Sequence, residues 1–197
     1  MRALTRREAL TAAAAAAALP LQSLAAQPAT PAVVKGRLKQ SVSRWCYSKI
    51  PMPEFCEAVK AMGLTAIDLL EEPDWAVVAD HGLICSMGYA GGGKIPDGLN
   101  VRANHDAIVK NFEEKIPIAA KLQVPNVITF FGNRRGMPDA EAIDNCIVGL
   151  NRIKKIGEDH NVMICVELLN SKVDHKDYQG DHTAFGVQVV KAVNSPR

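Results

Sequence analysis

The chain has 197 residues, a formal net charge of +2 and a hydrophobic content of 48%. This length suits one domain with a sizeable core. The nearly balanced charge, Lys+Arg 23 against Asp+Glu 21, gives no basic excess of the kind that nucleic-acid binding uses. No apolar run reaches the roughly 20 residues that a membrane span needs. From these totals we expect neither a nucleic-acid-binding protein nor an integral membrane protein.

Residues 1–26 predict an export signal. Arg6-Arg7 precedes seven alanines at 12–18, and Ser23-Leu24-Ala25 offers a cleavage site, which is the layout of a signal peptide of the twin-arginine type. An amphipathic leading helix fits less well, because residues 12–19 have no polar face. Without this segment the chain has equal numbers of basic and acidic residues. We therefore predict a signal over 1–26, a linker over 27–37 and periplasmic location by the twin-arginine route, with no membrane association after export.

The five cysteines do not form a recognisable framework. Their number is odd, their spacing is wide and no CxxC occurs, so neither a disulfide scaffold nor a zinc knuckle is expected. Cysteines in apolar runs usually act as small hydrophobic residues. Unpaired cysteines are compatible with a route that exports proteins already folded.

From residue 38 onward, short apolar runs alternate with longer amphipathic ones. The pattern predicts strands over 38–46, 65–70, 83–87, 126–131 and 162–168. Helices are predicted over 53–62, 73–81, 101–122, 139–159 and 183–193. Five successive βα units indicate a parallel sheet covered by helices.

Two architectures fit this alternation: a doubly wound open sheet and a (β/α)₈ TIM barrel. The five units take about 32 residues each, so eight would need about 256, close to the typical length of a barrel. We therefore predict an α/β fold, a TIM barrel truncated to about five βα units over 38–197. A complete five-stranded open sheet is the alternative.

In both architectures the active site lies at the carboxyl ends of the strands. Glu167 follows the apolar run 162–166, and a carboxylate in such a run is costly unless it is paired or binds a metal. We interpret it as a metal ligand or a general base, with a Glu paired to a neighbouring basic residue as the alternative. The polar loop behind it contains Asn170 and His175 and could bind an oxygen-rich substrate.

Other strand ends carry weaker signals. Trp45 and Tyr47 could stack on a sugar face, or cap the core. Arg134-Arg135 could hold an anionic group, and a solvent-exposed pair explains them equally well. The run 88–95 departs from a phosphate-binding loop, because Ile95 replaces the required hydroxyl and a proline follows. We interpret this run as a flexible loop over the substrate.

Several of these segments together resemble a known family. Trp45-Cys46-Tyr47, Ile67-Asp68-Leu69 and above all the stretch from Val166-Glu167-Leu168-Leu169-Asn170 to Asp181-His182-Thr183-Ala184 are similar to hydroxypyruvate isomerases. These belong to the xylose-isomerase-like TIM barrels, which include sugar epimerases and an abasic-site endonuclease branch. The resemblance extends over essentially everything after the linker.

The resemblance implies a divalent metal, Mg²⁺ or Mn²⁺, with Glu167 as one ligand and one of two proton-transferring glutamates. It places Asn170 near the substrate. It also implies three further ligands from later strands, one of them the second catalytic Glu, that these 197 residues do not include. Metals polarise carbonyl oxygens, and a carboxylate can remove the neighbouring proton to give an enediol.

We therefore predict a metal-dependent aldose–ketose type isomerase resembling hydroxypyruvate isomerase, with a small sugar or hydroxy-keto acid as substrate and activity impaired by truncation. The proposed site residues are Glu167 as base and ligand, and Asn170, His175, Trp45 and Tyr47 toward the substrate. A non-catalytic carbohydrate-binding or assembly module is the alternative. Open sheet edges favour a homo-oligomer or another partner. A nuclease is disfavoured by the neutral charge.

Overall fold

The structure is a computed structural model that describes residues 38–197. The predicted signal over 1–26 and linker over 27–37 lie outside the described residues. No helix within the described part of the chain is both long enough and apolar enough to cross a membrane.

Five parallel strands form one sheet in the order in which they occur along the chain. They are β1 (Ser41–Ser43), β2 (Ala66–Glu71), β3 (Ile84–Gly92), β4 (Asn126–Phe130) and β5 (Met163–Glu167). A doubly wound sheet reverses its strand order at a switch point, and this sheet has no reversal. The winding is therefore that of a TIM barrel, and the open-sheet alternative is excluded for these five strands.

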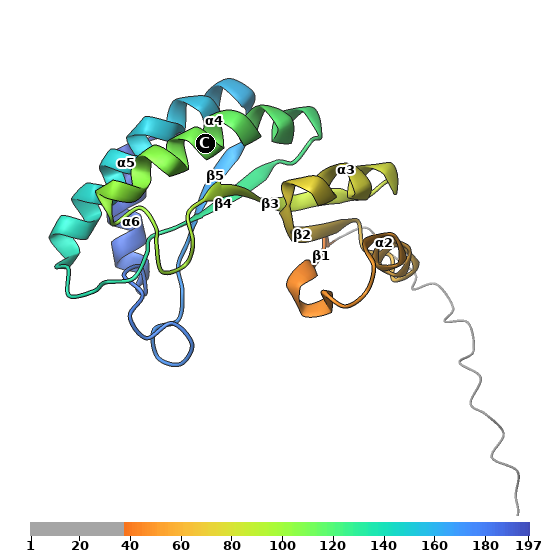
Figure 1. The fold of residues 1–197 in the computed structure, drawn as a ribbon, viewed down its shortest axis with the longest axis horizontal. Coiled ribbons are helices and arrows are strands. Elements are labelled where there is room, and N and C mark those ends of the chain that lie inside the picture. The colour runs from red at the N-terminus through yellow and green to blue at the C-terminus, as the bar shows by residue number, and fades with distance from the viewer. Residues whose placement is uncertain (1–37) are drawn as a thin grey trace, which may run out of the picture. The chain divides into compact units, whose positions relative to one another are not determined.

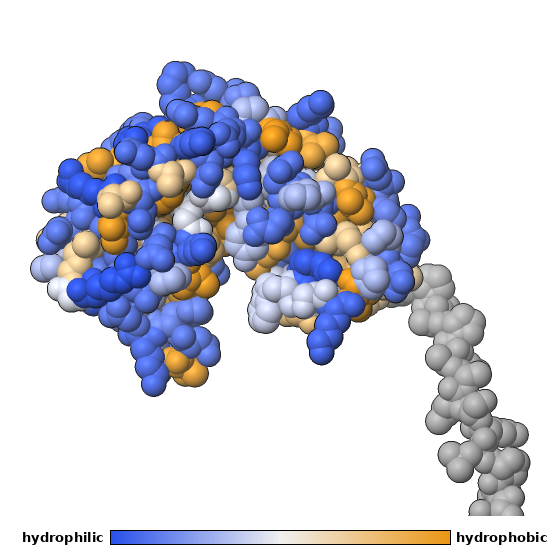
Figure 2. All heavy atoms as spheres, viewed as in Figure 1, coloured by the Kyte–Doolittle hydropathy of each residue, from blue (hydrophilic) through white to orange (hydrophobic). Residues whose placement is uncertain are grey.

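The helices α2 (Met52–Ala61), α3 (Glu72–Asp80), α4 (His105–Lys121), α5 (Asp139–His160) and α6 (Thr183–Val193) connect and follow the strands (Figure 1). The predicted helices are amphipathic: Phe112 and Ile116 of α4 and Ile153 of α5 are at most 1% exposed. Apolar side chains of the sheet, such as Ile67 and Val127, complete this core. The viewed surface of α4 and α5 is largely hydrophilic (Figure 2), as expected for amphipathic helices.

The first strand is shorter than predicted. It ends at Ser43, and Arg44–Tyr47 forms a short 3₁₀ helix instead of the strand end expected up to residue 46. The Arg44 guanidinium donates hydrogen bonds to the carbonyl oxygens of Tyr47, Ser48 and Ile50. These bonds close the turn, which explains why the apolar Trp45 and Cys46 do not extend β1.

The glycine-rich run was also predicted wrongly in part. Gly88–Gly92 belongs to β3, which continues five residues beyond the predicted end, so these residues are not a flexible loop. A methyl group on Gly88 would lie 2.6 Å from Cζ2 of Trp75. Trp75 is 1% exposed, and its indole N–H donates to the Leu70 carbonyl at 3.0 Å. The glycine is therefore required for helix α3 to pack closely on β3.

Three cysteines are buried: Cys56, Cys85 and Cys146. Burial raises the pKa of both Cys85 and Cys146 to about 12. Such thiols remain protonated and act as core residues, in agreement with the interpretation of the sequence.

We predict that Gly88→Ala destabilises the fold by roughly 1–3 kcal/mol, since overpacking of a filled site costs about this much. Urea unfolding would measure it. Gly186→Ala on α6 is the matched control, because its new methyl group would meet only the Leu168 side chain, at 3.2 Å, and alanine favours a helix by up to about 1 kcal/mol. A Gly88→Ala protein as stable as the control would contradict this packing.

Candidate functional site

A pocket of about 380 Å³ is lined by residues from all five strands and by none from a helix, so it lies on the sheet face that the helices leave uncovered. Its size lies in the range of small-molecule sites. Carboxylates and hydroxyls line part of it, and the rest is apolar. The lining residues are Ser41, Asp68, Leu69, Ser86, Met87, Ile128, Cys165, Val166 and Glu167.

Glu167 is the last residue of β5 and lies in the pocket wall. Its side chain is half-buried. Burial raises the pKa of this carboxyl above its usual value, and the charge of His175 partly offsets the rise. The alternation of a strand places Cys165 on the same face. A carboxylate that is partly desolvated at the carboxyl end of a barrel strand is suited to accept a proton.

A second carboxylate, Asp68 of β2, was not among the predicted site residues. Its two oxygens accept hydrogen bonds from Ser41 Oγ at 2.5 Å and Ser43 Oγ at 2.6 Å. Ser43 is paired directly with Asp68 in the ladder between β1 and β2. The sequence carried the same signal as for Glu167, an acidic residue inside an apolar run, together with two serines spaced by two.

Tyr89 of β3 is a further residue that the sequence did not single out. Burial raises the pKa of its phenol, and the charges of Glu167, Glu71 and Asp68 raise it further. The hydroxyl therefore lies within electrostatic reach of three carboxylates. It remains protonated at neutral pH and can donate a hydrogen bond.

The pocket wall also contains a strained residue. Leu69 has a φ of 57°, in the left-handed region that bulky side chains rarely adopt. The pairing of β2 with β3 shifts register on both sides of Asp68. Bulges of this kind redirect side chains and are over-represented next to active sites.

The predicted residues of the following loop differ in their placement. Asn170 is exposed, and its Oδ1 accepts the Lys172 amide at 2.8 Å, so it stabilises a turn of the loop. His175 is half-buried and acts on Glu167 through its charge. Neither lines the pocket, so contact of either residue with a substrate stays a prediction.

Trp45 and Tyr47 lie on the 3₁₀ helix after β1 and do not line the pocket. Trp45 is 67% exposed and Tyr47 46%. The Tyr47 ring stacks on Phe55 with 5.3 Å between centroids. Stacking of these two residues on a sugar stays a prediction without support from the geometry.

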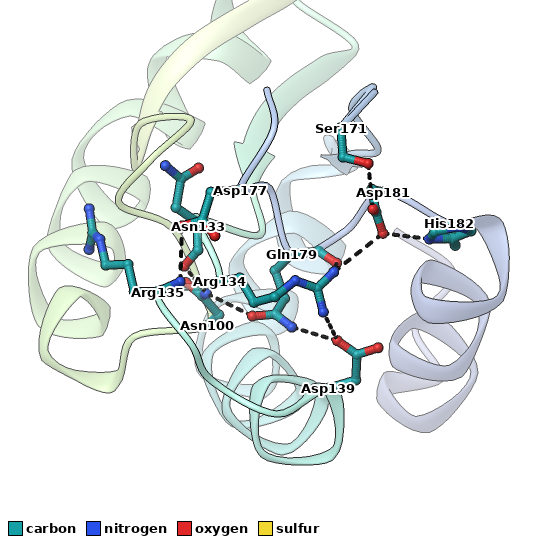
Figure 3. Close-up of polar contacts among 10 residues, drawn as sticks. All are labelled: Asn100, Asn133, Arg134, Arg135, Asp139, Ser171, Asp177, Gln179, Asp181 and His182. Carbon is teal, nitrogen blue, oxygen red and sulfur yellow. Dashed lines mark hydrogen bonds and ion pairs between the residues drawn. The ribbon is translucent and has the colours of Figure 1, made fainter. Parts of the chain in front are cut away.

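Both arginines after β4 form ion pairs, and those of Arg134 are drawn in Figure 3. Arg134 pairs with Asp139 and Asp181, and Arg135 pairs with Asp97 at 2.7 Å. Buried Gln179 donates a hydrogen bond to Asp139 at 2.7 Å. Both arginines therefore connect the loops, and the anionic-ligand role considered for them finds no support in these contacts.

Asp181 anchors this network. Burial alone would raise its pKa, but hydrogen bonds from Ser171 and His182 and the charges of His182 and Arg134 lower the pKa below its usual value of 3.8. Ser171 donates to Oδ2 at 2.6 Å. The Asp181 side chain is 11% exposed, but Arg134 is 33% and His182 78% exposed, so solvent partly screens these interactions.

We predict that Asp181→Asn lowers the free energy of unfolding at pH 7 by roughly 1.5–3 kcal/mol, the usual range for a hydrogen bond to a charged group. Because the folded-state pKa is lowered, the contribution is fully present above the usual pKa of 3.8 and is lost as the pH falls further, through the folded-state pKa. Urea unfolding at pH 7, 5 and 3 would measure it. Asp144→Asn, exposed on α5, is the control. A difference from the parent that is equal at all three pH values would contradict the role of the charge.

Residues 38–197 contain no group of three or more His, Cys, Asp or Glu side chains placed to hold one metal ion. Metal sites in proteins usually take at least three protein ligands or several oxygen donors. Glu167 could supply one ligand, and the oxygens of Asp68 already accept bonds from Ser41 and Ser43. The described residues therefore do not complete the metal site that the resemblance implies.

Comparison with protein-family models identifies the family of this chain. A family model described as a xylose isomerase-like TIM barrel (AP_endonuc_2) matches residues 56–197. The chain therefore belongs to the xylose isomerase-like TIM-barrel family, which confirms the predicted fold and family. The closer resemblance to hydroxypyruvate isomerases stays a prediction.

Solved structures share the fold at low sequence identity. An AP endonuclease, family 2, from Brucella melitensis has a TM-score of 0.69 and 15% identity over 81% of this chain and 66% of that one. D-Psicose 3-epimerase, crystallised in the presence of D-fructose, has a TM-score of 0.62 and 18% identity, over 81% and 61%. The IOLI protein, crystallised with a bound zinc atom, has a TM-score of 0.62 and 12% identity, over 80% and 59%.

These identities establish a shared fold and nothing finer. The chain spans 59–66% of the lengths of these three proteins. A comparison with curated proteins found no match.

Proposed function

We propose that the protein is part of a sugar isomerase or epimerase that catalyses proton transfer at the carbon next to a carbonyl, with Glu167 as a base. The observation that carries the proposal is a half-buried carboxylate with a raised pKa at the carboxyl end of β5, facing a pocket lined by all five strands. Catalytic residues of TIM-barrel enzymes lie at these strand ends. The fold shared with an epimerase supports it.

In the proposed reaction, the Glu167 carboxylate removes the proton from the carbon next to the substrate carbonyl. The electron pair of that C–H bond forms the C=C bond of an enediolate, while the carbonyl π pair moves to oxygen. The hydroxyl proton of the first carbon passes to this oxygen, so that the new carbonyl forms at the first carbon, and the protonated carboxyl gives its proton to the former carbonyl carbon. The phenol of Tyr89 remains protonated but does not line the pocket, so no hydrogen bond from it to the substrate is part of the proposed step. The apolar residues Met87 and Ile128 also line the pocket.

The finer part of the proposal concerns the substrate and cofactor. We infer a small hydroxy-keto acid such as hydroxypyruvate from the resemblance of the stretch around Glu167, Asn170 and His182. We also infer a divalent cofactor, Mg²⁺ or Mn²⁺, with Glu167 as the one ligand that the described residues supply. The zinc atom bound by the IOLI protein supports a metal in this family.

We predict that Glu167→Gln lowers kcat at least 100-fold, because loss of a general base typically costs 10²–10⁴-fold. The assay follows conversion of hydroxypyruvate to tartronate semialdehyde and of D-fructose to its C3 epimer, in D₂O, with and without Mn²⁺. Deuterium at the reacting carbon reports proton transfer directly. The control is Glu113→Gln, which removes the same charge from the exposed face of α4.

Turnover by Glu167→Gln equal to that of the parent would refute the role of this residue. The alternative, a non-catalytic carbohydrate-binding or assembly module, is favoured by the lack of a complete metal site in residues 38–197. Calorimetry with the same sugars distinguishes the two. Sugar binding that is independent of metal, without deuterium incorporation, would support the binding module.

We also infer export by the twin-arginine route, from the sequence of residues 1–26. Changing both Arg6 and Arg7 to Lys should retain the protein in the bacterial cytoplasm, because the paired arginines are the signal that the export system reads. Fractionation of cells expressing the parent and the double variant measures this. Equal amounts in the periplasm would contradict the inference.

A further inference from the structure

We propose that Tyr178 is a positioning residue, whose hydroxyl fixes the main chain of Glu167 at the mouth of the pocket. The inference rests on the proposed role of Glu167 as a base. Tyr178 does not line the pocket and so acts through Glu167.

The ladder between β4 and β5 shows where this hydroxyl acts. The pairing runs from Asn126 with Met163 to Phe130 with Glu167, and the Met163 amide donates to the Pro125 carbonyl at 2.9 Å. Bonds in a parallel ladder repeat every two residues. The next hydrogen bond of the ladder would therefore run directly from the Phe131 amide to the Glu167 carbonyl.

The Tyr178 hydroxyl lies at the position of that missing hydrogen bond. It accepts the Phe131 amide at 2.8 Å and donates to the Glu167 carbonyl at 2.9 Å. Both main-chain groups are satisfied, while the two strands are held apart by the width of one oxygen atom. This bridge lies at Glu167, the last paired residue of β5 and the one whose carboxylate faces the pocket.

The tyrosine is itself held firmly. Its side chain is fully buried, and its ring meets Phe131 edge to face, with 6.5 Å between centroids. On either side, the Gln179 amide donates to the Gly132 carbonyl at 2.9 Å and the Arg134 amide to the Asp177 carbonyl at 2.6 Å. Burial raises the pKa of the phenol, so the hydroxyl keeps its proton for the bond to Glu167.

The same residue places His175. The Tyr178 amide donates to the His175 carbonyl at 2.8 Å, and the two rings lie 6.4 Å apart. The loop therefore turns back at Tyr178 and brings an imidazole toward Glu167. The Tyr178 side chain thus bonds the end of β5, while its main-chain amide holds the loop that follows.

The test compares Tyr178→Phe with Thr129→Val. Thr129 is also fully buried, and its hydroxyl donates to the Gly92 carbonyl between β4 and β3. Each variant removes one buried hydroxyl with little change of shape, and both should lower Tm. We expect only Tyr178→Phe to lower kcat, at least about tenfold, with KM within twofold, since small displacements of a reacting group are costly.

Amide hydrogen exchange supplies a measurement that is independent of activity. The Phe131 amide should be protected in the parent, and its exchange should be at least about tenfold faster in Tyr178→Phe and unchanged in Thr129→Val. An unprotected Phe131 amide in the parent would overturn the proposal even if the variant did not fold. Equal kcat values for the two variants would also overturn it. If the parent shows no turnover, the proposed function fails, and the exchange measurement alone decides whether Tyr178 fixes this strand end.

Discussion

The parallel pairing of β1 to β5 in chain order is the constraint on which the pocket depends. Because every strand runs in the same direction, all five carboxyl ends lie along one edge of the sheet. Helices cover one face of the sheet. Polar residues of the strands can therefore lie only on the opposite face or at the strand ends. Asp68 and Glu167 are 99 positions apart in the sequence, yet they line one hollow because of this winding.

The loops at this edge make the arrangement specific. The segment after β5 is bound back onto the segment after β4 through Arg134, Gln179 and Asp181 (Figure 3). Gly180 allows this return, because a methyl group there would lie 2.1 Å from the Phe131 ring. The network contributes no pocket-lining residue. Its role is to hold the end of β5, which carries Glu167.

The sequence predicted the fold well where periodicity was strong. The helix over 183–193 was predicted to the residue, and the second, fourth and fifth strands to within two residues. The prediction failed where individual side-chain contacts override the local hydrophobic pattern. Arg44 stabilises a turn at Trp45 and Cys46, where the apolar pattern predicted a strand. Gly88–Gly92 extends β3 although glycine is depleted in strands, and at Gly88 the missing side chain leaves room for the buried Trp75.

The site could be predicted only in part, for a related reason. Glu167 was found because an acidic residue interrupts an apolar run, and the same signal marks Asp68. Tyr89 carries no such signal, since a tyrosine in a strand is ordinary. Tyr178 lies in a polar loop, and its role depends on a gap between two strands that only the three-dimensional structure reveals.

The charges around the pocket bear on the chemistry that we propose. Its lining includes two carboxylates and no basic side chain, and Glu71 adds a third negative charge near Tyr89. The enediolate carries negative charge on oxygen, and carboxylates nearby would oppose that charge. The proposed proton transfer therefore requires a positive charge that the residues lining this pocket do not provide. A divalent cation bound in part by Glu167 would meet that requirement, and a binding module would have no need of one.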